Sequence, residues 1–161
     1  MGKKGLNPEF ERCREKGKII AFEKGTSLVG KELDSARDDL QASKESSDRG
    51  NYKWATIQAY YSMFHTSRGL IYAQKYREKS HYCLVVALEH LYLEKGFLPK
   101  KYIESLAIGK EMRESADYRS NFSRDGAGNL IKAAEEFFEA AQKLLKMIPG
   151  RSEKHQDGNS L

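Results

Sequence analysis

The chain has 161 residues, of which 39% are hydrophobic and 32% are charged, with a formal net charge of +5 at pH 7. At roughly 100–200 residues per domain, this length predicts one domain that buries its own core and needs no metal or disulfide staple. No stretch approaches the roughly 18 consecutive apolar residues of a membrane span, and no secretory signal is recognisable. We therefore expect a cytoplasmic protein rather than a membrane or secreted one.

Charge is distributed unevenly along the chain. Residues 1–27 contain seven basic and four acidic side chains, a net charge of +3, whereas the remainder is nearly balanced. This pattern gives only weak support for nucleic-acid binding. It predicts a basic, partly flexible N-terminal segment at 1–27, a helical body at 28–148 and a disordered tail at 149–161.

The metal-binding and redox side chains show no recognised spacing. Cys13 and Cys83 stand alone, without the paired cysteines and histidines of a zinc motif. The four histidines lie outside any His-Glu-x-x-His or Glu-x-x-His pattern. We therefore expect free structural thiols, as in a reducing cytoplasm, and neither a metal nor a cofactor.

Helical periodicity recurs along the chain, and few residues alternate as in a strand. The first helix is predicted at about 28–47 and ends before Gly50, which suits a left-handed C-terminal position. Asn51 is expected to cap a second helix that runs to about Gln74. One face of this second helix is formed by Trp54, Ile57, Tyr61, Phe64, Arg68 and Ile71.

The second half of the chain continues the helical pattern. Ser80 is expected to cap a third helix that Gly96 ends, and Pro99 begins a fourth at its first turn. Residues 115–129 are polar and interrupted by glycine, which favours a loop before a last helix at about 130–147. Together these elements predict an all-α fold, an antiparallel up-and-down bundle of four to five helices.

Arg68 is a single charge on the otherwise apolar face of the second helix. Such a side chain must be paired, reach solvent along its stem or meet a partner. One interpretation is a contact with an anion or a phosphate at a groove or interface. The other is an arginine at the edge of the face, bound to a local carboxylate.

His81 begins the third helix on its buried side, next to Lys75, Arg77 and Lys79. A basic turn at a helix N-terminus can hold a phosphate, which makes Arg77 and His81 candidate ligands. Alternatively, the imidazole packs at the end of the bundle and bonds a carbonyl.

The predicted loop before the last helix is rich in hydrogen-bond donors and aromatic rings. In one interpretation the loop binds a nucleotide, and Tyr118 or Phe122 stacks on its base. Arg119 or Arg124 would contact its phosphate. Equally, Tyr118 would fill the core while Asp117 pairs with Arg119.

Several segments resemble prokaryotic HEPN domains. The second helix, with NYKWA at 51–55 and QAYYSMFH at 58–65, is similar to the second helix of that family. Further similar segments are EKGKI at 15–19, ARDDL at 36–40, YREKSH at 76–81 and SADY at 115–118. The resemblance covers roughly residues 12–146.

The resemblance implies a small helical bundle that forms a homodimer. Many HEPN proteins are partners of a minimal nucleotidyltransferase, frequently as toxin and antitoxin. The family also suggests a nucleotide or RNA as a ligand. The candidate binding residues in this sequence are Arg68, Arg77, His81, Tyr118, Arg119 and Arg124.

Other members of the family cut RNA through an arginine and a later histidine with four to six residues between them. Arg119 has no histidine at that spacing, and only three residues separate Arg77 from His81. We therefore expect a HEPN module that binds a nucleotide or a nucleotidyltransferase and has no assigned catalytic residue.

Two alternatives stay open. The first is a metal-independent RNase toxin that uses Arg119 with His81 or His65, brought from elsewhere in the dimer. The second is general RNA binding through the basic residues 1–27.

Overall fold

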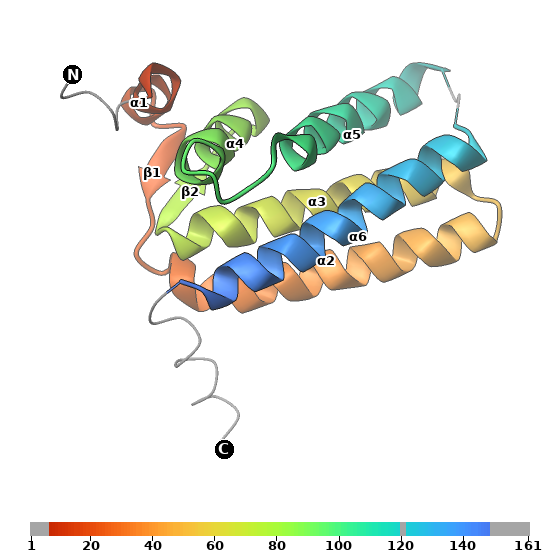
Figure 1. The fold of residues 1–161 in the computed structure, drawn as a ribbon. Coiled ribbons are helices and arrows are strands. Elements are labelled where there is room, and N and C mark those ends of the chain that lie inside the picture. The colour runs from red at the N-terminus through yellow and green to blue at the C-terminus, as the bar shows by residue number, and fades with distance from the viewer. Residues whose placement is uncertain (1–6, 120–121, 149–161) are drawn as a thin grey trace, which may run out of the picture.

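The computed structural model describes residues 7–119 and 122–148 (Figure 1). Four long helices run antiparallel in an up-and-down bundle (Figure 1). They are α2 (Gly25–Asp48), α3 (Tyr52–Ala73), α5 (Lys100–Arg119) and α6 (Arg124–Lys146). The predicted all-α bundle is thus confirmed.

The shorter elements gather at one end of the bundle, opposite the α2–α3 turn (Figure 1). They are α1 (Pro8–Glu15), β1 (Ile19–Ala21), β2 (Tyr76–Glu78) and α4 (His81–Leu88), which continues as a π-helical segment (Glu89–Leu93). The two strands pair antiparallel, with Ile19 opposite Glu78. Sequence periodicity missed this sheet because strands of three residues are too short to show alternation.

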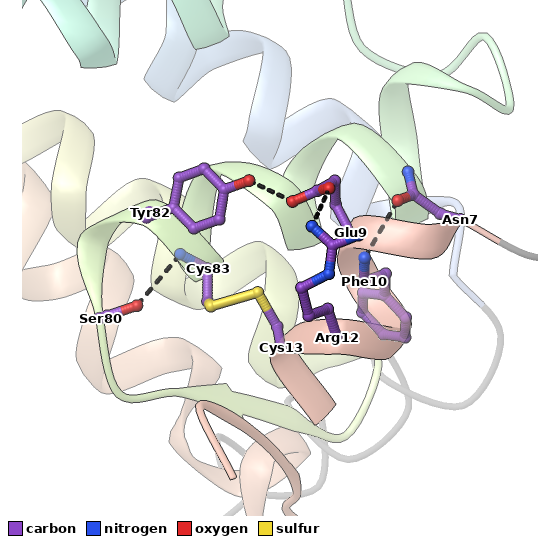
Figure 2. The surroundings of a disulfide bond; sticks show 8 residues. All are labelled: Asn7, Glu9, Phe10, Arg12, Cys13, Ser80, Tyr82 and Cys83. Atoms are coloured by element: carbon purple, nitrogen blue, oxygen red, sulfur yellow. Dashed lines mark hydrogen bonds and ion pairs between the residues drawn. A yellow bond between two sulfur atoms is a disulfide. The ribbon is translucent and has the colours of Figure 1, made fainter. Parts of the chain in front are cut away.

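The first described residues pack onto the bundle. Phe10 and Ile19 are each only 2% exposed and belong to the core. A disulfide joins Cys13 in α1 to Cys83 in α4 (Figure 2), so the prediction of two free thiols was wrong. The two cysteines are 70 residues apart in sequence, and a pair so distant leaves no local spacing signal. The pairing also removes the support that free thiols gave to a reducing compartment.

The residues predicted to end or cap helices do so at Gly50 and Ser80, but Asn51 does not cap α3 through its side chain. Gly50 follows α2 with a φ of +78°, as predicted. The Ser80 hydroxyl caps α4 by accepting a hydrogen bond from the Cys83 backbone N–H. Asn51 precedes α3, but its side chain makes no capping hydrogen bond.

The loop predicted at 115–129 is largely helix. α5 extends to Arg119, and α6 begins at Arg124 with the Ser123 hydroxyl accepting from the Gly126 N–H. This cap and the burial of Ala127 stabilise a first turn that its glycines alone would disfavour. Residues 120–121, and the predicted tail at 149–161, lie outside the described residues.

α3 is the central helix, because α2, α5, α6 and α4 all pack against it. Its small side chains allow a close approach to α2, where the Ser62 hydroxyl donates to the Ala36 carbonyl at 2.8 Å. The hydroxyls of Thr66 and Ser67 donate to carbonyls one turn earlier in the same helix. The polar groups of a buried helix are satisfied in this way. Among the described helices, none is long and apolar enough to cross a membrane.

Gly25 provides a test of how closely α2 approaches α3. A Cβ atom at this position would lie 2.5 Å from the Tyr72 carbonyl oxygen, a backbone atom that cannot move aside cheaply. We expect Gly25→Ala to lower the free energy of unfolding by about 1–3 kcal/mol, measured by urea denaturation.

Gly30, also in α2, is the matched control, because no heavy atom lies within 4 Å of its Cβ position. Gly30→Ala should stabilise the protein by up to about 1 kcal/mol through helix propensity alone. Equal effects of the two substitutions would contradict the close approach.

Candidate functional site on α3, α4 and α5

Three aromatic side chains project from one side of α3. Tyr60 and Tyr61 have ring centroids 5.4 Å apart, and Tyr61 meets Phe64 edge-on at 6.5 Å. Side chains three and four residues apart lie on the same helix face, which explains this row. One turn further along α3, the Arg68 guanidinium stacks 4.7 Å from the Phe64 ring centroid. The row of aromatic rings therefore ends in a cationic group.

Arg68 is held by a carboxylate from β2. Its Nε donates to Glu78 Oε1 at 3.0 Å, and its second donor reaches Oε2 at 3.4 Å. Glu78 is only 4% exposed, and this burial raises the pKa of its carboxyl although Arg68 acts in the opposite direction. The local-carboxylate interpretation of Arg68 is therefore present in the structure, and the guanidinium is engaged within the chain.

His81, the first residue of α4, lies beside the same row. Its ring is 6.0 Å from the Tyr60 ring, and its Nε2 atom is buried without a hydrogen-bond partner among the described residues. Burial, with a smaller contribution from Lys110, lowers the pKa of His81 to about 4, while Glu114 opposes this shift. The imidazole is therefore neutral at pH 7, with one nitrogen unused.

α5 contributes an arginine that covers the tyrosines. The Arg113 guanidinium lies 5.1 Å from the Tyr61 ring centroid and 6.0 Å from that of Tyr60, within cation–π range. Burial raises the pKa of the Tyr60 phenol to about 12, so Tyr60 stays protonated at neutral pH. Lys110, one turn before Arg113, lies 3.6 Å from Glu114. We call the surface formed by Tyr60, Tyr61, His81, Lys110 and Arg113 the Tyr61–Arg113 face.

A glycine lets α5 approach this part of α3. A Cβ at Gly109 would lie 3.1 Å from the Met63 methyl and 3.2 Å from Tyr60 Cδ1. A larger residue would therefore push α5 away from the tyrosines. Tyr60 itself is 4% exposed and forms the floor of the face, whereas Tyr61 and Arg113 are half-buried and form its surface.

The other predicted site residues are dispersed. Arg77 is exposed on β2 and stacks 5.5 Å from the Phe22 ring, because strand neighbours face opposite sides and Glu78 points inward. Arg124 is exposed in the first turn of α6. Tyr118 and Arg119 occupy the last turn of α5, but their side chains lie outside the described residues.

Sequence reasoning missed Arg113 and Lys110 as site residues. Their spacing of three places both on one side of α5, but nothing local indicates that α3 presents its tyrosines there. The sequence places Tyr61 on the apolar face of the second helix and Tyr60 in the family-like segment 58–65, but it singles out neither as a site residue.

A second polar cluster joins α2 to α3. His65 Nδ1 lies 2.6 Å from Glu32 Oε2, and its Nε2 lies 3.7 Å from Asp39 Oδ2. Burial raises the pKa of Asp39, with His65 acting against it. In the part of the chain that the structure describes, no group of three or more His, Cys, Asp or Glu side chains could hold a metal ion.

The lowered pKa of His81 predicts a pH dependence of stability. Between about pH 4 and 6.5 the unfolded chain binds a proton at His81 that the folded chain does not, so stability rises with pH across this window. Since the ring is only half-buried, screening by water limits the gain to on the order of 1–2 kcal/mol.

The measurement is urea denaturation of the wild type and His81→Gln at pH 4.5 and 7. The wild type should gain more stability on going to pH 7 than the variant does. Glu78 and Asp39, whose raised pKa values act in the opposite direction, are common to both proteins and cancel in the difference. Identical gains would show that His81 is not neutral in the folded state at pH 4.5.

Comparison with known proteins identifies the family. The HEPN domain model matches residues 30–145, which include α3, α4, α5 and most of α2 and α6. The chain is also similar to "Putative toxin MJ0605" of Methanocaldococcus jannaschii, with 25% identity over 117 residues that cover 72% of this chain and 87% of the relative. The resemblance to the HEPN family is thus confirmed, and this chain belongs to it.

Proposed function

We propose that this chain is a toxin-type HEPN protein that binds a nucleotide, or the phosphate of an RNA, on the Tyr61–Arg113 face. The observation that carries the proposal is Arg113 stacked on Tyr61 and Tyr60, beside a neutral His81. Family membership and the toxin name of the archaeal relative support the toxin-type part.

The chemistry of the face suits a nucleotide. Half-buried Tyr61 offers a ring on which a base can stack, an interaction that tolerates any base. A guanidinium that lies over a ring keeps its N–H groups in its own plane, pointing away from the ring, where they are available for a phosphate. Lys110 adds a second positive charge one turn away on α5.

We further propose that the protein acts in the cytoplasm as the partner of a minimal nucleotidyltransferase, as the family resemblance implies. The missing Arg-x4-6-His spacing supports a module that binds rather than cuts. Affinity capture of the tagged protein from its host tests the partnership: a nucleotidyltransferase should co-purify in fixed ratio.

A homodimer is also part of this proposal. An apolar cavity of about 260 Å³ lies between α5 and α6, lined by Ile108, Met112, Leu130 and Ala133 among others. Ile108 is 53% exposed, and Trp54 on α3 is 50% exposed. Exposed apolar surface of this kind supports contact with a second chain. Light scattering at micromolar concentration should give twice the monomer mass, and a monomer would contradict the dimer.

Arg113 provides the direct test of ligand binding. We expect Arg113→Ala to weaken binding of ATP or of a short oligoribonucleotide at least tenfold, measured by calorimetry, because a charge-assisted contact to phosphate is lost.

Arg37→Ala is the matched control. Like Arg113, Arg37 lies over an aromatic ring: its guanidinium is 5.4 Å from the Phe138 ring centroid. It also pairs with Asp34 on α2. Its removal changes the net charge equally but leaves the Tyr61–Arg113 face intact. An equal loss of affinity in both variants would mean that only overall charge matters, which contradicts a specific site.

The second candidate is a metal-independent RNase, and the free Nε2 of neutral His81 favours it. In that reaction His81 would take the proton of a ribose 2′-hydroxyl, and O2′ would attack phosphorus to form a 2′,3′-cyclic phosphate. The 5′-oxygen would leave and take a proton from water. Arg113 would stabilise the charge on the phosphate. Arg119, the arginine that the sequence suggested for this role, lies further along the same helix.

Cleavage of RNA in EDTA tests this candidate. His81→Gln should then lower the cleavage rate by about 100-fold or more. A comparison of the rates of Arg113→Ala and Arg119→Ala shows which of the two arginines contacts the phosphate. Cleavage that is unaffected in His81→Gln would exclude His81 as the base.

A further inference from the structure

The disulfide attaches a short element that buries only two side chains against the rest of the fold. α1 has eight residues, too few to be stable as an isolated helix. Its buried side chains are Phe10, which packs against the rings of Tyr76 at 5.4 Å and His90 at 4.4 Å, and Cys13. The Arg14 guanidinium also lies 6.0 Å from the Tyr76 ring centroid. The other described bonds of α1 to the bundle are exposed hydrogen bonds, from Tyr82 to Glu9 and from Asn7 to Glu94 (Figure 2 shows the first).

At its other end, the disulfide is attached to the first turn of α4, which begins at His81. Cys83 follows His81 by two residues, and its backbone N–H donates to the Ser80 hydroxyl at 3.2 Å (Figure 2). The helix cap, His81 and the disulfide therefore share the first turn of α4. A change in the position of Cys83 is transmitted directly to the ring beside Tyr60.

The disulfide does not join the long helices of the bundle. Cys13 precedes the region that matches the HEPN model, residues 30–145, whereas Cys83 lies inside it. Breaking the bond leaves the contacts among α2, α3, α5 and α6 in place. We therefore expect reduction to release α1 while the four long helices stay folded, although both cysteines are buried in the core.

We propose that the Cys13–Cys83 disulfide is a reversible redox staple that fixes the first turn of α4 and so controls the Tyr61–Arg113 face. Its effect on ligand binding rests on the proposed function, whereas its effect on α1 and α4 does not.

The chemistry is an exchange with a dithiol. One thiolate of the dithiol attacks a protein sulfur, the Cys13–Cys83 bond breaks, and a mixed disulfide forms. The second thiolate displaces the protein sulfur, which leaves two protein thiols and one oxidised dithiol, a transfer of two electrons. A small disulfide oxidant reverses the reaction. Cys13 and Cys83 are 3% and 4% exposed, so α1 must open locally before the sulfurs can be attacked.

Hydrogen exchange on the full chain tests the staple. After treatment with dithiothreitol, amides at 9–15 and 80–84 should lose protection by about tenfold or more, while those at 130–145 keep theirs. Oxidised glutathione should restore the original pattern. Unchanged protection at 80–84, or reduction that occurs only with loss of the whole helical signal, would overturn the proposal.

The double variant Cys13→Ser/Cys83→Ser is the control, because it should show the reduced pattern with or without dithiothreitol. A second variant, Phe10→Ala, loosens α1 while keeping both cysteines and should speed reduction severalfold. An unchanged rate in Phe10→Ala would show that opening of α1 does not limit access to the sulfurs, contrary to the proposal.

ATP affinity measured in both redox states separates this inference from the proposed function. Weaker binding in the reduced protein, by severalfold or more, is expected. Equal ATP affinities in the two redox states would show that the disulfide does not control the Tyr61–Arg113 face. Absence of ATP binding in both states overturns the proposed function. The exchange pattern at 80–84 then tests the redox staple independently of ligand binding.

Discussion

One half-buried charge, Arg68 on α3, constrains how this bundle is assembled. α3 carries only two residues with a permanent charge, Lys53 near its start and Arg68 near its end. Because other helices cover α3 on most sides, Arg68 can lie there only with a counter-charge. Glu78 supplies it at 3.0 Å, although burial of that carboxyl is itself unfavourable. β2 must therefore run alongside the end of α3.

The position of β2 determines where α4, β1 and α1 lie. Glu78 lies three residues before His81, with Ser80 as the cap between them, so the ion pair positions the start of α4. Ile19 pairs with Glu78 across the small sheet, which brings β1 and then α1 to the same end of the bundle. The disulfide closes this arrangement over 70 residues, a constraint worth about 4 kcal/mol if the unfolded chain is random.

The features that were predictable from sequence are those with local causes. Helical periodicity, the turn at Gly50, the Ser80 cap and the start of α5 after Pro99 each depend on neighbouring residues. The three-residue strands and the disulfide depend on distant contacts, so local patterns missed them. The helical part of 115–129 depends on burial of Ala127 and on the local Ser123 cap, which the glycines obscured. The sequence indicated Arg68 and His81 as site residues, because each lies on the apolar face of a predicted helix, but it did not indicate Arg113. Its importance arises only when α5 packs against Tyr61 of α3.

The two candidate functions require different access to His81. A general base must come within hydrogen-bond distance of the 2′-hydroxyl, but the Nε2 atom of His81 is buried. Catalysis would therefore require the first turn of α4 to move. Stacking on Tyr61 and phosphate contact with Arg113 require no such movement, because both side chains reach the surface. In its oxidised form, with α4 held by Cys83, the face is thus better suited to binding a nucleotide than to cleaving RNA.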